Sequence, residues 1–363
     1  RNIKTDAVSI PVFVISQETK SGRHVLELRH RITGAAFHIQ RSKDGQPGSV
    51  NFATIGSDIL DEGVEQDLQT VGFLGKYAPA NFEFDRYPMQ VDIDIKGPVV
   101  PSRIFANGQQ TASGEQSWNV NFPESLNASS IWLEVISTDE VETFDTAFQG
   151  IKSSIPVTMY VPKSEKMNVL AQQTLEDVFK AQVEPTLRFM EKNIAPYPHS
   201  ALLISLPAFR GNSMEYAGAT NTDLGELPHE VVHSWFGRGV KPALGRDGWF
   251  DEAAALWLTS VVYRDLNWPT KLDAVASSPL GDLSPFEQLT PSSVYLHGPQ
   301  LMVNLNYLLR ETGGVLPILR EFYLKNSERP VKWEMFRSGV LEKTPEKLRS
   351  EVERVFNRLV LAR

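Results

Sequence analysis

Two histidines four residues apart, with a glutamate directly after the first, are the residues in this sequence best suited to chemistry. They are His229, Glu230 and His233, in an H-E-x-x-H arrangement. On a helix, positions i and i+4 lie on the same face, so both imidazoles can reach one metal ion. A catalytic zinc ion takes three protein ligands and keeps a fourth position open for water. The pattern therefore predicts a zinc site that still needs one ligand.

Glu252 supplies the missing ligand, because it stands nineteen residues after His233 at the start of a second predicted helix. Asp251 is the predicted N-cap of that helix, and the alanines behind it favour helix formation. The chain has no cysteine, so a metal ion has to rest on imidazole and carboxylate groups. We therefore expect one Zn²⁺ per chain, held by His229, His233 and Glu252.

Hydrolysis is the chemistry that this set of residues favours. Zinc lowers the pKa of its bound water towards neutrality and polarises a carbonyl as a Lewis acid. Glu230 directly follows His229 in the sequence, so its carboxylate can lie beside that water and take its proton as a general base. The same carboxyl can then pass the proton to a leaving amine. These residues predict a metal-dependent hydrolase.

The segment from His229 to Trp257 resembles the gluzincin metallopeptidases of the aminopeptidase N type. In that family H-E-x-x-H is followed by a glutamate after eighteen residues, the spacing found here. Trp235–Gly237 match the family after the second histidine, and Trp249 matches it three residues before the glutamate. The resemblance covers residues 156–363 well and the rest loosely. It implies a zinc aminopeptidase, a hydrolase that removes N-terminal residues from peptides.

Two further segments carry residues to which the resemblance assigns a role. Gly211–Gly218 resembles the family's G-x-M-E-N motif, whose glutamate binds the free amino group of the substrate and is here Glu215. Ser292–Gly298 resembles the family's tyrosine motif, and that tyrosine, here Tyr295, stabilises the oxyanion of the tetrahedral intermediate. On the residues alone, a solvated loop acid also explains Glu215, and a packing role also explains Tyr295.

The chain departs from the family pattern at three points. Tyr216 stands where the family usually has asparagine, which bears on the shape of the amine subsite, and His297 replaces the usual lysine near the tyrosine. The sequence also ends after the expected catalytic domain, where family members usually continue into a helical domain that closes the cleft. We therefore expect a short form with a more open site. A zinc endopeptidase with a relaxed amine subsite, and a non-catalytic scaffold that retains the peptidase fold, stay open as alternatives.

The elements that position these residues change type along the chain. Alternating apolar residues predict strands in the first part, as at Met89–Ile95 and Trp118–Phe122. Apolar residues recur at helical spacing later, from Leu175 to Met190 and from Leu301 to Leu309. Short helices are also expected near the C-terminus.

We therefore expect an α+β fold with two domains. Residues 1–162 form an antiparallel β-sheet domain, and residues 163–363 form a mainly helical catalytic domain. The resemblance implies that the first is saddle-like and the second thermolysin-like.

The composition narrows the class of partner. The net charge of −8 argues against a nucleic-acid partner, and no apolar run approaches the length of a membrane span. A peptide substrate is the expected partner. The compartment stays open, although a start at Arg1 and the lack of cysteine favour an extracytoplasmic protein. The oligomeric state, the physiological substrate and the preferred residue at the cleaved position are not readable from the sequence.

Overall fold

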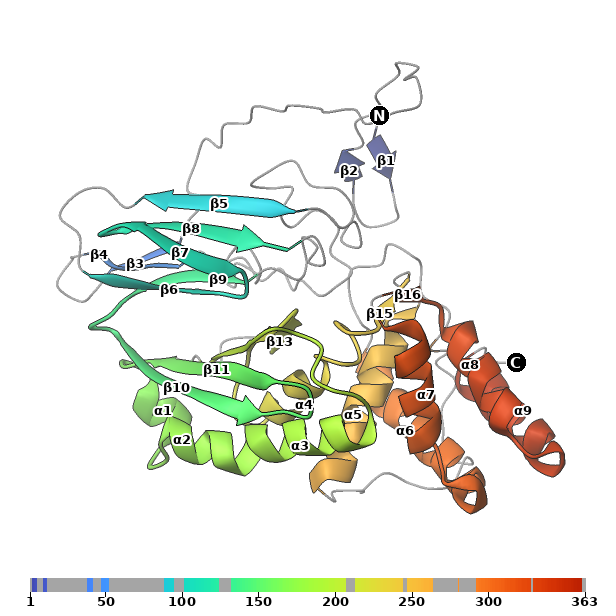
Figure 1. Cartoon of the computed structure of the whole chain (residues 1–363). Helices are drawn as coiled ribbons and strands as arrows, with labels where there is room; N and C mark the ends of the chain where they lie inside the picture. Colours follow the sequence, from blue (N-terminus) through green and yellow to red (C-terminus); the bar gives the residue numbers. More distant parts are fainter. Residues whose placement is uncertain are drawn as a thin grey trace.

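The computed structural model describes residues 88–94, 101–123, 132–206, 213–243, 247–263, 280, 292–327 and 329–360, and the backbone of four short strands nearer the N-terminus. Strands dominate the chain up to residue 162, and helices dominate the remainder (Figure 1). The structure therefore confirms the predicted α+β class, with β-sheets first and a mainly helical part after them.

The strands and helices have the following bounds. The strands are β1 (Asn2–Lys4), β2 (Ser9–Pro11), β3 (His38–Arg41), β4 (Pro47–Asn51), β5 (Met89–Asp94), β6 (Ser102–Ala106), β7 (Gln109–Gly114), β8 (Ser117–Phe122), β9 (Leu133–Ser137), β10 (Val141–Gln149), β11 (Ser154–Pro162), β12 (Leu202–Ser205), β13 (Met214–Tyr216), β14 (Ala219–Asn221), β15 (Lys241–Pro242) and β16 (Pro330–Val331). The helices are α1 (Lys166–Leu170), α2 (Leu175–Val178), η5 (Phe179–Val183), α3 (Glu184–Asn193), α4 (Leu227–Val232), α5 (Trp249–Tyr263), α6 (Ser292–Leu308), η8 (Arg310–Thr312), α7 (Leu316–Asn326), α8 (Trp333–Lys343) and α9 (Glu346–Leu359).

A five-stranded sheet in the order β10-β11-β12-β14-β13 lies between the N-terminal strands and the helices (Figure 1). Its central pairs, β11 with β12 and β12 with β14, are parallel, whereas both edge strands pair antiparallel. The N-terminal strands form antiparallel sheets in the orders β3-β4-β9-β6 and β5-β8-β7. The antiparallel character predicted for the first part of the chain is confirmed for these strands, and Ile95 lies outside the described residues.

Strand β11 is buried on both faces and so joins two layers. Val157, Met159 and Val161 pack into the large core beneath the helices. Tyr160 faces the other way, into a smaller core that also contains Phe105 of β6. The two rings are stacked with centroids 3.8 Å apart. Apolar residues alternate along this part of β11, and its second face meets the N-terminal strands, because a strand in the middle of a layered fold is covered on both sides.

The expected domain boundary at residue 162 falls inside the five-stranded sheet. Strands β10 and β11 end at or before Pro162, and they pair through β12 with strands that come after it. The division into 1–162 and 163–363 therefore stays a prediction, and this sheet connects its two parts.

The helical segment predicted from Leu175 to Met190 is present with one irregularity. It consists of α2, the π-helical turn η5 and α3, which follow one another without a break. A capping box fixes its start, because Thr174 Oγ1 accepts from the backbone N–H of Asp177 and an Asp177 carboxylate oxygen accepts from that of Thr174. The helices predicted near the C-terminus are α7 and α9.

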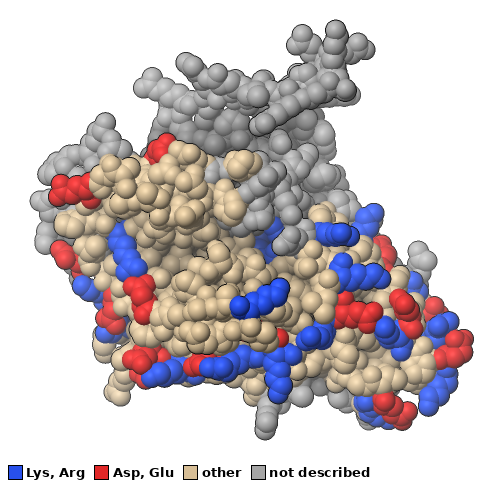
Figure 2. Space-filling model, in the orientation of Figure 1, with Lys and Arg blue, Asp and Glu red and all other residues tan. Residues whose placement is uncertain are grey.

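On the face that Figure 2 shows, basic and acidic side chains are interspersed over the helical layer. This face therefore does not present one continuous charge of either sign. Within the described part of the chain, the helices lack the combined length and apolar character that a bilayer crossing requires.

A buried carboxyl group joins the N-terminal strands to the five-stranded sheet. Glu134 on β9 is 7% exposed and accepts a hydrogen bond of 2.5 Å from Tyr160 Oη on β11. The indole N–H of Trp132 donates to the same hydroxyl at 2.9 Å. Burial raises the pKa of Glu134 from 4.5 to about 7; the hydrogen bond from Tyr160 partly offsets this rise, and the charge of Glu165 adds to it.

We predict that Glu134→Gln raises the free energy of unfolding, relative to the wild type, more at pH 8 than at pH 5. The raised pKa means that the folded chain holds this proton more tightly than the unfolded chain. Its contribution to stability is complete below about pH 4.5 and is lost as the pH rises through about 7. Glutamine carries no such proton, so the unfolding free energy of Glu134→Gln lacks this pH dependence. As the pH rises, the difference in unfolding free energy between the variant and the wild type should therefore change by about 3 kcal/mol.

Urea unfolding at the two pH values measures this difference. Glu115→Gln, in the exposed turn between β7 and β8, is the matched control and should follow the wild type. Parallel shifts of all three proteins between pH 5 and pH 8 would show that Glu134 is not the group responsible.

Candidate functional site

Helix α4 presents the first two predicted ligands. His229 and Glu230 lie within it, and His233 follows its last residue with φ −59° and ψ −18°, still in helical conformation. The backbone N–H of His233 donates to the carbonyl of His229 at 3.2 Å, so the i, i+4 relation predicted from the sequence holds. Leu227 and Val231 on this short helix are fully buried and fix it in the large core.

Helix α5 presents the third predicted ligand in its first turn. The helix begins at Trp249, so Glu252 lies near its start, as expected. Asp251 is not the N-cap, because it lies inside the helix, where its Oδ1 accepts from the backbone N–H of Glu252 at 2.8 Å. The helix starts earlier than predicted because Trp249 and Phe250 are both buried and pack as part of its first turn.

The ligand atoms of the three residues converge on one point. The Nε2 atoms of His229 and His233 are 3.0 Å apart, and Glu252 Oε2 lies 3.2 Å from the first and 3.5 Å from the second. Ligands about 2.0–2.1 Å from a zinc ion in tetrahedral geometry are separated from one another by about 3.3 Å. The donor set and its spacing therefore fit one Zn²⁺, the site that the sequence predicted at His229, His233 and Glu252.

Hydrogen bonds and charges prepare these atoms for a cation. The carbonyl of Phe236 can only accept, so the 2.8 Å contact with His233 Nδ1 places the proton on Nδ1 and leaves Nε2 with its lone pair. Burial alone would raise the pKa of Glu252, but the adjacent imidazoles of His233 and His229 outweigh this effect. The net pKa is well below the usual range, which favours the ionised ligand.

Gly237 brings the chain close to the second histidine. Its φ of +121° is one that residues with a side chain rarely adopt. A Cβ at this position would lie 3.0 Å from His233 Nδ1 and 3.4 Å from Glu215 Oε1. The glycine therefore allows the Phe236 carbonyl to reach His233.

Glu230 is buried beside the ligands, as a general base would be. It is 5% exposed, and its Oε2 has no hydrogen-bond partner among the described residues. Burial, and then the charge of Glu215, raise its pKa well above the usual range. A carboxyl with a raised pKa and a free oxygen can both take and return a proton near neutral pH.

Tyr295 on α6 contacts the predicted ligand Glu252 on α5, because these two helices pack closely. Its hydroxyl donates to Glu252 Oε1 at 3.2 Å, and burial followed by the charge of Glu252 raises its pKa, which keeps the phenol protonated. One turn later in α6, a Cβ on Gly298 would lie 2.9 Å from the Cβ of Ala253 in α5. The small residues let the two helices approach, and so bring the tyrosine to the site.

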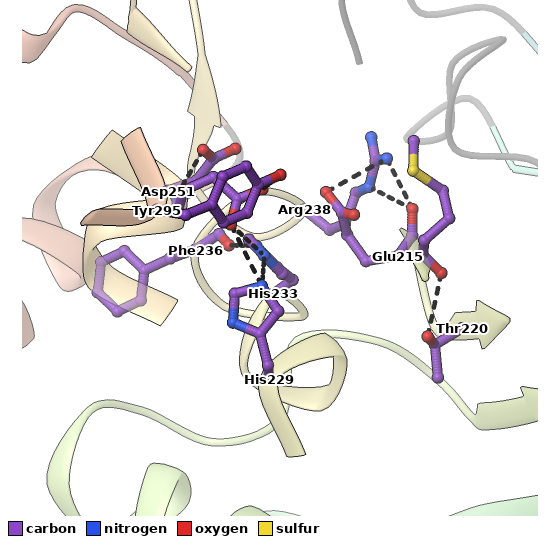
Figure 3. A network of polar contacts seen from close by, with 10 residues as sticks. Glu215, Thr220, His229, His233, Phe236, Arg238, Asp251 and Tyr295 are labelled. Atoms are coloured by element: carbon purple, nitrogen blue, oxygen red, sulfur yellow. Dashed lines mark hydrogen bonds and ion pairs between the residues drawn. The ribbon is translucent and has the colours of Figure 1, made fainter. Parts of the chain in front are cut away.

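Glu215 on edge strand β13 approaches the site from the opposite side (Figure 3). The guanidinium of Arg238 donates to the Glu215 carbonyl at 2.7 and 3.1 Å and lies 3.6 Å from its carboxylate. The carboxylate oxygen lies within 4.8 Å of ring nitrogen atoms of His233. A loop acid in solvent, which the sequence left open, does not describe Glu215, because the residue is 7% exposed.

Both residues that depart from the family pattern are buried. Tyr216 is fully buried in the smaller core, with its ring centroid 5.0 Å from that of Trp132. Its side chain therefore lies on the opposite face of the sheet from that of Glu215. His297 is buried on α6, and its Nδ1 has no hydrogen-bond partner within the described part of the chain. Gly211 and Asn212 lie outside the described residues.

Three features of the site are not predicted by the sequence, namely Arg238, Gly298 and the position of Asp251 inside α5. Arg238 lies between two glycines, and no spacing rule distinguishes it from a surface arginine, although it is only 3% exposed. Gly298 was noted only as the end of a motif. The sequence predicts Asp251 as the N-cap, whereas it lies inside α5 with a buried carboxylate.

Comparison with known proteins gives structural but no sequence-level matches. No family model and no curated protein matches the sequence. Among solved structures, the M1 zinc metallopeptidase from Deinococcus radiodurans matches with a TM-score of 0.62 and 17% identity, covering 86% of this chain and 69% of that one. A two-domain M1 zinc metallopeptidase mutant bound to L-tryptophan matches with a TM-score of 0.58 and 17% identity, over 75% and 63% of the two chains. Legionella pneumophila aminopeptidase A in complex with aspartic acid matches with a TM-score of 0.51 and 14% identity, over 70% and 32%.

This chain has the fold of the M1 zinc metallopeptidases. The match extends over most of its length, and the chain carries the His229, His233 and Glu252 group with the spacing of a zinc site. The chain spans between about a third and just over two thirds of the length of these three structures, with shares of 32%, 63% and 69%.

We predict that Gly237→Ala weakens zinc binding to this M1 fold by roughly 10- to 100-fold, the usual effect of disturbing a residue that orients a ligand. The added Cβ is strained at φ +121° and crowds His233 Nδ1, which should displace the Phe236 carbonyl from its hydrogen bond. Competition with a chromogenic chelator measures the affinity.

Gly339→Ala is the matched control. A Cβ there would meet nothing within 4 Å, and the residue lies on α8, so its zinc affinity should equal that of the wild type. Equal zinc affinities for Gly237→Ala and Gly339→Ala would contradict the role of Gly237 in positioning His233.

Proposed function

We propose that the protein is a zinc-dependent aminopeptidase that hydrolyses N-terminal residues from peptides. The observation that carries the proposal is the convergence of His229 and His233 Nε2 with Glu252 Oε2, all within 3.0–3.5 Å, beside a buried carboxyl group, that of Glu230. A structural ion site needs no buried carboxyl with a free oxygen next to it, whereas a hydrolytic site requires a base.

His229, His233 and Glu252 would hold the zinc ion. When bound, the ion supplies Lewis acidity, which acidifies a water molecule and polarises a peptide carbonyl. Glu230 then serves as the general base, because its Oε2 is free to accept a proton and its raised pKa favours holding that proton until the leaving amine takes it.

Tyr295 and Glu215 would bind the two ends of the scissile residue. The Tyr295 hydroxyl, which lies beside Glu252, is a neutral donor suited to the oxyanion of the tetrahedral intermediate. Glu215 would pair with the α-ammonium of the substrate. Arg238 holds the backbone of Glu215 in place through its carbonyl and so fixes the distance between amine and scissile bond.

The similar structures support a peptide substrate. A mutant of the Deinococcus radiodurans M1 zinc metallopeptidase binds a Tyr-Ser-Ala substrate, and Legionella pneumophila aminopeptidase A binds aspartic acid. For this chain, the orientation of Tyr216 also favours an aminopeptidase over an endopeptidase. The sequence suggested that Tyr216 loosens the amine subsite, but its side chain lies in the smaller core, away from Glu215.

We predict that Glu230→Gln binds zinc like the wild type but hydrolyses aminoacyl amides roughly 100- to 10,000-fold more slowly, since it lacks the base. Elemental analysis should find about one zinc per chain in both proteins. Chelation should abolish the wild-type activity, and added zinc should restore it.

Undiminished hydrolysis by Glu230→Gln would contradict the mechanism. A wild type that contains no zinc, and binds none on addition, would contradict the enzyme assignment and favour a scaffold.

We predict that N-acetylation of a peptide blocks its hydrolysis, because the acetylated amine carries no charge for Glu215. The kcat/KM of the free peptide should exceed that of the acetylated form by roughly 100-fold or more, and Glu215→Gln should remove roughly 10- to 100-fold of that preference. Steady-state kinetics on the matched pair of peptides measures both values. Equal cleavage of the two peptides by the wild type would identify an endopeptidase instead.

A further inference from the structure

Strand β13 carries Glu215 at the edge of the five-stranded sheet. It has three residues, and among the described strands it pairs with β14 alone, which is equally short. A strand of this length gains little from its own ladder, and its outer edge presents backbone groups that need other partners. Contacts from elsewhere in the molecule therefore have to fix the position of Glu215.

Two side chains from distant parts of the chain hold the backbone at this edge. The guanidinium of Arg238, in the loop after α4, donates to the carbonyl of Glu215 at 2.7 and 3.1 Å (Figure 3). Nδ2 of Asn107, in the turn between β6 and β7, donates to the carbonyl of Ala217 at 2.8 Å. The backbone is therefore held on both sides of Tyr216, once from the catalytic side and once from the N-terminal strands.

The amide of Asn107 uses both of its ends in this contact. The backbone N–H of Trp132 donates to Asn107 Oδ1 at 2.9 Å, while Nδ2 donates to Ala217. An N–H can only donate and a carbonyl can only accept, so these two partners fix the orientation of the amide. An asparagine before a glycine is ordinarily a turn former whose side chain bonds nearby backbone. Here the amide reaches residues 25 and 110 positions away, so it joins separate elements.

The turn that carries Asn107 is itself firmly held. The backbone N–H of Asn107 donates to the carbonyl of Trp132 at 3.3 Å. A Cβ on Gly108 would lie 2.9 Å from two side chains of β8, so the turn packs directly against that strand. The ring of Trp132 lies against that of Tyr216, with centroids 5.0 Å apart. The same part of the N-terminal strands therefore fixes the two residues that follow Glu215.

The carbonyl of Ala217 depends on this donor. Ala217 is 5% exposed, and a buried carbonyl without a hydrogen bond is unfavourable. Gly218 follows with φ +76°, and a glycine offers little resistance to rotation of the peptide group before it. Without the Asn107 amide, we expect this peptide group to turn towards water and β13 to lose its single position.

We propose that Asn107 is a positioning residue for Glu215, through which the N-terminal strands set the place of this carboxylate beside the zinc site. The inference rests on the proposed aminopeptidase function, in which Glu215 pairs with the substrate ammonium. Asn107 acts through the Ala217 carbonyl, so its effect on the reaction should depend on Glu215.

Hydrogen exchange of the zinc-loaded full chain tests the contact directly. Asn107→Asp keeps the acceptor for the Trp132 N–H and removes the donor to Ala217. The amides of residues 214–221 should exchange roughly 3- to 10-fold faster than in the wild type, the effect of losing one hydrogen bond. The amides of α9 should keep their wild-type rates. Asn107→Ala, which adds no charge, should accelerate the same amides at least as much.

Steady-state kinetics on a peptide with a free N-terminus tests the consequence for the reaction. Asn107→Asp should raise KM roughly 3- to 10-fold and change kcat by less than about twofold, because it weakens binding of substrate and transition state alike. In a chain that already carries Glu215→Gln, Asn107→Asp should change kcat/KM by less than about twofold. A residue that acts through Glu215 has no further effect once that carboxylate is absent.

Asn121→Ala is the matched control. It removes the same amide from β8 of the N-terminal strands, where Asn121 is exposed. Its exchange rates and its kinetic constants should equal those of the wild type.

Two results would overturn the proposal: wild-type exchange at residues 214–221 in both Asn107 variants, or the same loss of kcat/KM with and without Glu215→Gln. The second result would give Asn107 a general role in stability. The exchange measurement needs no hydrolysis, so it is separable from the proposed function. A wild type that cleaves no peptide would contradict the aminopeptidase, while faster exchange confined to residues 214–221 would still show that Asn107 holds β13.

Discussion

The structure depends on a concentration of negative charge next to two buried histidines. Glu215, Glu230 and Asp251 are each less than 10% exposed, and Glu252 contributes a fourth carboxylate with a side chain 15% exposed. Isolated burial of even one such charge costs several kcal/mol. The fold sustains this arrangement because Arg238 pairs with Glu215, because the ligand spacing fits a metal ion, and because burial raises the pKa of Glu230 and so favours its neutral form. Burial, and then the charge of Glu215, raise the pKa of Glu230, whereas the adjacent His233 and His229 lower the pKa of Glu252, so a base and a ligand arise from one residue type in one small volume.

Small residues make this convergence possible. The two histidines come from α4 and its C-cap, Glu252 from α5, Tyr295 from α6 and Glu215 from β13. Gly298 against Ala253 sets how closely α6 approaches α5, and Gly237 sets how closely the loop after α4 approaches His233. A methyl group at either glycine would lie 2.9–3.0 Å from its neighbour, so the geometry of the site is limited by backbone approach.

The sequence predicted the parts of the structure that follow from local spacing. The i, i+4 histidines, the glutamate on a second helix and the change from strands to helices all depend on periodicity, and each is found in the structure. The burial of Arg238, the π-helical turn η5 and the extension of the five-stranded sheet across residue 162 depend on contacts between distant segments, which no local pattern encodes. Asp251 illustrates both kinds of information. Its residue type predicts an N-cap at that position, whereas the buried Trp249 and Phe250 start the helix two residues earlier.

Strand β13 connects the N-terminal strands to this site. Neighbouring residues on a strand face opposite sides, so the direction of Glu215 is fixed by where Tyr216 packs. Tyr216 is held against Trp132 in the core that the N-terminal strands cover, and the pairing of Glu215 with Thr220 sets its register. A slip of one residue would turn the carboxylate into that core and the phenol ring towards the histidines. Among the described residues, the N-terminal strands add no ligand to the zinc site. Their packing decides instead which face of β13 the carboxylate occupies, because it holds Tyr216 on the opposite face.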